Sequence, residues 1–175
     1  MGAWLRRYRW PVLVGAVVVV GLVIYLVWQS GRQLPPPRAR VYTDFSACLL
    51  TDANGVSSAA AAPVWAGMQA ASLKTSGKVS YLAVSGPDTP ANAVPYVNTL
   101  VQRRCNLVLA VGPAEVAAVR TQAPTFSAVR FVVVEPGTGA GSSANVSTVE
   151  QSSDSSVSSS IEELVTRAAS KATVR

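Results

Sequence analysis

The sequence contains an uncharged run of nineteen residues near its start, from Trp10 to Trp28. A helix of this length, at about 1.5 Å per residue, nearly spans the roughly 30 Å hydrocarbon core of a bilayer. Aromatic residues flank both ends of the run, as they do at membrane interfaces. No polar face interrupts it, which argues against a helix of a soluble core. We therefore predict that residues 10–28 form a single transmembrane helix.

A cleaved secretory signal peptide is the alternative interpretation of this run. Its apolar region would be about 7 to 15 residues long and would precede a small-x-small cleavage site, which the following segment QSGRQLPPPR does not offer. Three arginines flank each side of the run and barely discriminate between the two orientations. The free N-terminal amine and the short tail favour a cytoplasmic N-terminus. We expect a single-pass protein of the cell membrane, with residues 1–9 in the cytoplasm and the domain outside it.

The charge of the chain is divided unevenly. Its formal value is +6, and all of it lies before Val41, because the residues from Val41 to Arg175 include nine basic and nine acidic ones. A neutral domain with scattered cations argues against a nucleic-acid partner. Residues 29–40 include three consecutive prolines, which predict a stiff linker between membrane and domain.

Several kinds of chemistry are missing from the sequence. The chain has no histidine, which excludes Ser-His and Cys-His nucleophile pairs and histidine metal sites. Two cysteines cannot fill a structural zinc site, and the glycines at 137, 139 and 141 lack the Lys-Ser/Thr pair of a phosphate-binding loop. We therefore expect a protein that is not an enzyme, with no catalytic residue, metal or cofactor.

Short apolar runs alternate with helical patterns through the domain. The runs lack the period-2 alternation of half-buried strands, which is typical of parallel strands buried on both faces. They are Ser46 to Thr51, Val79 to Val84, Leu107 to Val111 and Arg130 to Val134, with Asn145 to Val149 as a weaker fifth. Helix-like spacing covers Pro63 to Leu73, Asn92 to Arg104 and Ala114 to Gln122, with Pro95 in a first turn that begins near Val94. This order predicts an α/β fold with a parallel sheet.

The end of the chain is rich in serine. Half of the residues from Gly141 to Ser160 are serine, which predicts a solvated loop rather than core. Ser160 and Glu163 fit a capping box, so the last helix is predicted to begin there, with Glu162 and Glu163 near its N-terminus. Residues 151–175 are therefore expected to form a Ser-rich segment and a C-terminal helix that follow the domain of residues 41–150.

Three stretches resemble a known family: LLTDANGV, PVWAGMQAAS and LVLAVGPAEVAAVRTQAPTFSAVRFVVVE. From Cys48 to Glu150 the chain is similar to the basic membrane protein (BMP) family of ABC-transporter solute-binding proteins, which have the type I periplasmic-binding-protein fold. The best markers are Thr51-Asp52 before Gly55, the Trp65-x-Gly67-Met68 helix and the Ala110-Val111-Gly112 strand end. The resemblance implies a flavodoxin-like first lobe, with three αβα layers and strand order 2-1-3-4-5, and a small, nucleoside-like ligand.

The chain departs from this family in two ways. The polar run that grips the ligand in the family is replaced by Ser57-Ser58-Ala59-Ala60-Ala61-Ala62, and only the first of the two lobes is present. A half site exposes its ligand and loses affinity. Two functions therefore stay open: a membrane-anchored solute-binding module, and an envelope interaction or assembly protein whose exposed lobe face binds a protein partner or a second copy.

Candidate ligand-binding residues follow the predicted strands. Open α/β sheets bind ligands at the carboxyl ends of their strands. Asp52, Asn54, Ser85, Gly112 and Glu135 occupy such positions. The competing interpretation is that these residues only cap turns and helices.

The two cysteines predict a disulfide. Cys48 lies near the start of the first strand and Cys105 just before the third, and these strands are neighbours in the order 2-1-3-4-5. Adjacent strands lie about 4.8 Å apart, within reach of the roughly 4.4 to 6.8 Å between α-carbons that a disulfide needs. An oxidising compartment outside the cytoplasm would permit the bond. Two buried free thiols are the alternative.

Overall fold

The computed structural model describes residues 18–25, 41–137 and 144–173. The chain divides into two compact units, Met1–Ala39 and Arg40–Arg175. Of the predicted membrane segment, residues 18–25 are helical and exposed, while the remainder, the N-terminal tail and the proline linker lie outside the described residues. Within the described part of the chain, no helix reaches the length and hydropathy that a membrane crossing requires. The span therefore stays a prediction.

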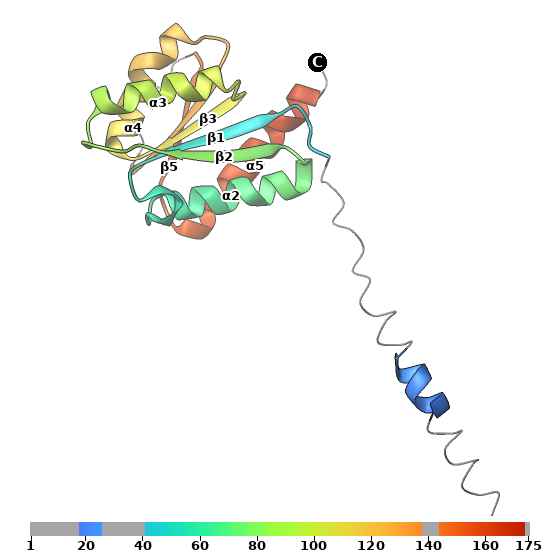
Figure 1. The fold of residues 1–175 in the computed structure, drawn as a ribbon. Coiled ribbons are helices and arrows are strands. Elements are labelled where there is room, and N and C mark those ends of the chain that lie inside the picture. The colour runs from blue at the N-terminus through green and yellow to red at the C-terminus, as the bar shows by residue number, and fades with distance from the viewer. Residues whose placement is uncertain (1–17, 26–40, 138–143, 174–175) are drawn as a thin grey trace, which may run out of the picture. The chain divides into compact units, whose positions relative to one another are not determined.

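The second unit is built on a five-stranded sheet (Figure 1). Its strand order is β2-β1-β3-β4-β5 and every neighbouring pair is parallel, which confirms the predicted α/β fold and strand order. The strands are β1 (Ser46–Thr51), β2 (Lys78–Ala83), β3 (Leu107–Val111), β4 (Arg130–Glu135) and β5 (Val146–Glu150). Because all five run the same way, one edge of the sheet holds their amino ends and the opposite edge their carboxyl ends. We call these the amino edge and the carboxyl edge.

Helices cover both faces of the sheet and complete three layers (Figure 1). Successive strand residues point to opposite faces. Leu49 therefore packs on one side with α2 and α5, and Leu50 on the other with α3 and α4. The helices are α2 (Ala61–Thr75), α3 (Pro90–Gln102), α4 (Pro113–Gln122) and α5 (Asp154–Thr173), with two short 3-10 helices, η1 (Gly55–Ser57) and η2 (Ala123–Thr125).

One predicted strand differs from expectation in its burial. The run from Val79 to Val84 was expected to be buried on both faces, but β2 is an edge strand, and Lys78, Ser80 and Tyr81 are exposed. Among the described residues β2 has a neighbouring strand on one side only, so no further strand shields its outer side from solvent. The apolar character of this run indicates that a strand forms, but it does not indicate that the strand is fully buried.

The predicted start of the last helix is wrong. Helix α5 begins at Asp154, so Ser160 lies inside it and does not cap it. Glu162 and Glu163 are accordingly mid-helix residues that form ion pairs with Lys74 and Arg167. The serines from 155 to 160 are helical because the same stretch carries Val157 and Ile161 into the core against α2.

Helix α3 also begins earlier than predicted. Thr89 caps it by accepting a hydrogen bond from the Asn92 amide at 3.3 Å, and Pro90 occupies its first turn. Pro95 therefore lies within the helix and not at its start. Thr89 and Pro90 therefore set the start of the helix about one turn before the predicted start near Val94.

Candidate functional site

The five candidate residues all lie at the carboxyl edge of the sheet. Asp52 and Asn54 follow β1, Ser85 follows β2, Gly112 follows β3, and Glu135 ends β4. The strand order changes direction between β1 and β3, because the chain adds β2 on one side of β1 and the later strands on the other. Open α/β folds bind their ligands at this switch point.

Asp52 and Asn54 form one turn. The Asp52 Oδ1 atom accepts a hydrogen bond from the Asn54 backbone amide at 3.0 Å. Asn54 in turn precedes η1, whose first residue, Gly55, donates to the Asp52 carbonyl oxygen at 3.0 Å. The turn-capping role that competed with ligand binding is therefore present for one oxygen of Asp52.

Ser85 and Glu135 interact with the helices that follow their strands. The Ser85 carbonyl oxygen accepts from Asn92 Nδ2 at 2.8 Å and from the Tyr96 hydroxyl at 3.3 Å, which ties the loop after β2 to α3. Glu135 forms an ion pair with Arg120 of α4. These two residues are held by their own neighbours, whereas Asp52 and Gly112 flank the switch point.

Gly112 brings a further carboxyl group to this edge. Its φ of 111° is strained for any residue with a β-carbon, and a β-carbon there would overlap the Glu115 carboxylate. Glu115 lies in the first turn of α4 and is only 1% exposed. Its Oε2 atom has no hydrogen-bond partner among the described residues. A buried, unsatisfied carboxyl oxygen therefore lies directly beside the switch point.

The environment of Glu115 disfavours its charged form. Burial raises the pKa of the Glu115 carboxyl above its ordinary value of 4.5, and a hydrogen bond from its own backbone amide partly offsets this. The negative charges of Asp88 and Asp52 raise the pKa further. Three carboxyl groups thus interact at one edge of the sheet, which suits a ligand that donates hydrogen bonds.

Sequence reasoning did not select Glu115. An acid in the first turn of a helix usually complements the helix dipole and stays solvated. The pair Gly112-Pro113 before it predicts a helix start but does not report burial. The signal that could have indicated burial was Gly112. A glycine three residues before an acid leaves room for the acidic side chain to fold back over the backbone.

Replacement of Glu115 by glutamine tests this environment. Below pH 4.5 the carboxyl is protonated in both the folded and the unfolded chain. As pH rises from there through the higher folded-state pKa, the unfolded chain releases its proton first, so stability falls and stays lower at neutral pH. Glu115→Gln keeps the shape and cannot ionise. We expect its melting temperature to exceed that of the parent at pH 7 and to equal it near pH 4.

A matched control is Glu163→Gln on α5. Glu163 is 70% exposed and pairs with Arg167 one helical turn away. Such a pair contributes no more than about 0.5 kcal/mol, so the melting temperature should change little at either pH. A Glu115→Gln variant that melts below the parent at pH 7 would show that the charged carboxylate stabilises α4.

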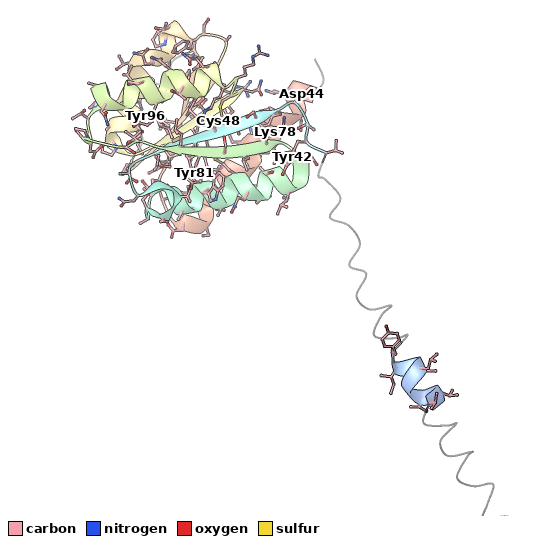
Figure 2. The ribbon with its side chains drawn as sticks, viewed as in Figure 1. Tyr42, Asp44, Cys48, Lys78, Tyr81 and Tyr96 are labelled. Atoms are coloured by element: carbon pink, nitrogen blue, oxygen red, sulfur yellow. A yellow bond between two sulfur atoms is a disulfide. The ribbon has the colours of Figure 1, made fainter. Side chains whose placement is uncertain are left out.

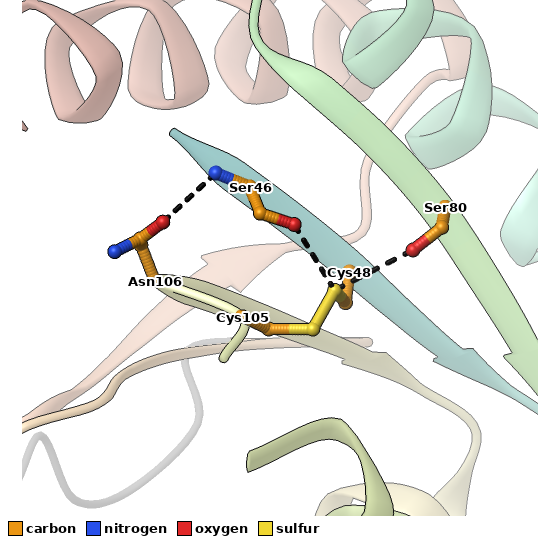
Figure 3. The surroundings of a disulfide bond; sticks show 5 residues. All are labelled: Ser46, Cys48, Ser80, Cys105 and Asn106. Carbon is orange, nitrogen blue, oxygen red and sulfur yellow. Dashed lines mark hydrogen bonds between the residues drawn. A yellow bond between two sulfur atoms is a disulfide. The ribbon is translucent and has the colours of Figure 1, made fainter. Parts of the chain in front are cut away.

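The predicted disulfide joins Cys48 and Cys105 at the amino edge (Figure 3). The two α-carbons are 5.9 Å apart, and both residues are buried. Ser80 donates a hydrogen bond to Cys48 Sγ at 3.5 Å, and the Asn106 side chain accepts from the Ser46 amide at 2.9 Å. The bond thus staples β1 to the residues before β3, at the opposite edge from the candidate site.

Comparison with known proteins bears on the fold. A solved structure that resembles the chain is the fragment described as "putative lipoprotein from Peptoclostridium difficile 630", with a TM-score of 0.54 and 15% sequence identity. The match covers 73% of this chain and 98% of that one. No protein-family model matches the sequence, and a search of curated proteins finds no match. At this identity the likeness extends to the three-dimensional arrangement alone, and the chain shares the fold of that lipoprotein fragment.

Proposed function

We propose that this protein is a membrane-anchored, extracytoplasmic ligand-binding module, with one solute-binding lobe that resembles the first lobe of the BMP family. The residues from 10 to 28 are its transmembrane anchor, with residues 1–9 in the cytoplasm. The disulfide supports an extracytoplasmic domain, because such bonds persist in oxidising compartments. The structural neighbour, described as a lipoprotein, is consistent with a domain held at a membrane.

The observation that carries the binding role is the buried, unpartnered Glu115 carboxyl oxygen at the switch point. A buried polar atom without a partner is costly, and a ligand hydroxyl or amine would satisfy it. Asp52 supplies a second carboxylate beside it. Ribose hydroxyls are donors that protein carboxylates bind in other α/β folds, so a nucleoside-like ligand fits this chemistry. The module would present or sense such a ligand without converting it.

Calorimetry on the full chain in nanodiscs, with adenosine, guanosine, inosine, uridine and cytidine as ligands, tests the binding role. We expect at least one nucleoside to bind. Asp52→Asn should weaken that binding about tenfold or more, because a hydrogen bond to a charged group contributes roughly 1.5 to 3 kcal/mol. Glu163→Gln, far from the switch point, should bind like the parent. Absence of heat with all five nucleosides would contradict the proposal.

A second candidate is an interaction or assembly protein of the cell envelope, and the edge strand β2 favours it. The Tyr81 ring on this strand makes an edge-on contact with Trp65 of α2, with centroids 5.5 Å apart, and Tyr81 remains exposed. An exposed aromatic beside an unpaired strand edge is a common feature of protein interfaces. A dimer in cross-linking and light scattering that Tyr81→Lys abolishes would favour this function.

A further inference from the structure

The domain is neutral in total, but its charges are separated between the two edges of the sheet. Lys78 and Arg130 begin β2 and β4 at the amino edge, Arg103 and Arg104 lie between α3 and β3, and Lys171 lies in the last turn of α5. Within the described residues, none of these five cations forms an ion pair. Asp44, which is exposed two residues before β1, offsets one of their charges.

The carboxyl edge has the opposite charge. Six acidic residues lie at the carboxyl ends of strands or at the beginnings of the helices that follow them. They are Asp52, Asp88, Glu115, Glu135, Glu150 and Asp154. Arg120, which pairs with Glu135, offsets one of them. The sheet therefore has a basic edge and an acidic edge.

Exposed apolar side chains accompany the cations at the amino edge. Val41, Tyr42 and Leu73 are 85%, 47% and 67% exposed. The Thr43 amide donates to the Ser76 carbonyl oxygen at 2.9 Å, which holds the entering chain against the end of α2. Figure 2 shows Tyr42, Asp44 and Lys78 at this end of the domain. Helix dipoles account for cations at helix C-termini, but they do not account for exposed apolar residues among them.

The entry point of the chain links this edge to the membrane. The domain begins at the amino edge, because the residues from Val41 onward lead directly into β1. The twelve residues between the predicted anchor and Val41 can reach at most about 40 Å when extended. An anchored chain therefore allows its basic and apolar edge to reach the headgroups.

We propose that the amino edge binds the anionic surface of the bilayer in which the chain is anchored. This inference rests on the anchor of the proposed function. Lysine and arginine are attracted to anionic headgroups, and tyrosine and aliphatic side chains insert at the interface. The acidic carboxyl edge is repelled by the same surface, so the candidate ligand site faces away from the membrane and stays open to solvent.

Energy transfer in nanodiscs tests the orientation. The full chain is incorporated into discs of phosphatidylcholine alone or with 30% phosphatidylglycerol, with an acceptor dye on the headgroups. A donor is attached through Ser127→Cys, at the amino edge, or through Ser153→Cys, at the carboxyl edge. In anionic discs we expect stronger transfer from the Ser127 position than from the Ser153 position, and we expect salt to reduce this difference. In neutral discs the difference should shrink by at least half.

Charge variants make the test specific. Lys78→Gln with Arg130→Gln removes two positive charges from the amino edge and should abolish the lipid-dependent difference. Gln69→Glu in the middle of α2, combined with Ser159→Glu in the second turn of α5, changes the net charge equally and should leave the difference intact.

Two outcomes would overturn the inference, and they are distinguishable. Equal transfer from both positions in a chain that is incorporated into the discs contradicts membrane binding by the amino edge and leaves the anchor standing. A chain that does not enter the discs contradicts the anchor and, with it, this inference. Nucleoside binding is measured separately and is not affected by either result.

Discussion

Replacing both Cys48 and Cys105 with alanine should lower the free energy of unfolding by about 4 kcal/mol. The disulfide joins residues 57 positions apart, and on the chain-entropy account a loop of this length restricts the unfolded chain by that amount. Urea unfolding of the full chain in nonionic detergent, followed by circular dichroism, measures the change. The urea dependence should also steepen, because an unfolded chain without the cross-link exposes more surface.

Ser80→Ala is the matched control for this prediction. It removes the hydrogen bond from Ser80 to Cys48 Sγ and keeps the disulfide. It should therefore lower the free energy of unfolding by less than about 1 kcal/mol. Equal stability of the double variant and the oxidised parent would contradict the prediction. Peptide mapping that recovers two free thiols from the membrane-inserted protein would contradict the oxidising environment as well.

Gly67→Ala should destabilise the domain by about 2 kcal/mol, although alanine is the better helix former. At Gly67, helix α2 packs tightly against α5. A β-carbon there would overlap the Ser158 carbonyl oxygen and would lie 3.0 Å from Ile161 Cβ and 3.2 Å from the Glu162 amide nitrogen. The obstacle is mostly backbone, so the helices must separate, and overpacking of this kind costs roughly 1 to 3 kcal/mol.

The exposed neighbour Ala66 provides the control. Ala66→Gly should cost about 1 kcal/mol through helix propensity alone. Propensity by itself would make Gly67→Ala stabilising by a similar amount, so the sign of the measured change separates the two effects. Thermal and urea unfolding of both variants give that sign. A Gly67→Ala variant that is more stable than the parent would show that α5 can shift at little cost.

The sequence predicted the sheet well because its signals are local. The apolar runs of β1 and β3 match the observed strands residue by residue, since a strand buried on both faces needs an uninterrupted run. The disulfide prediction also needed the strand order implied by the family resemblance, because strand order and strand ends determine which cysteines are neighbours. The candidate residues at the carboxyl edge were located by the same reasoning.

The sequence failed where contacts across the fold override local preference. Serine is a mediocre helix former, so the stretch after residue 151 resembled a loop. It is helical because Val157 and Ile161 pack against α2 beside Gly67, and burial contributes more than propensity does. The solvent exposure of β2 could not be predicted for a related reason. The sequence of a strand does not show whether it lies at the edge or in the centre of the sheet.

By itself, the sequence determined the α/β class, the strand order expected from its family resemblance, the cysteine pairing and an uncharged N-terminal segment long enough to cross a bilayer. Only the tertiary structure decided that Glu115 is buried beside the switch point, that α5 belongs to the core, and that cations and carboxylates gather at opposite edges. These properties depend on which side chains surround a residue in space. A linear pattern records the composition of each element and not its neighbours.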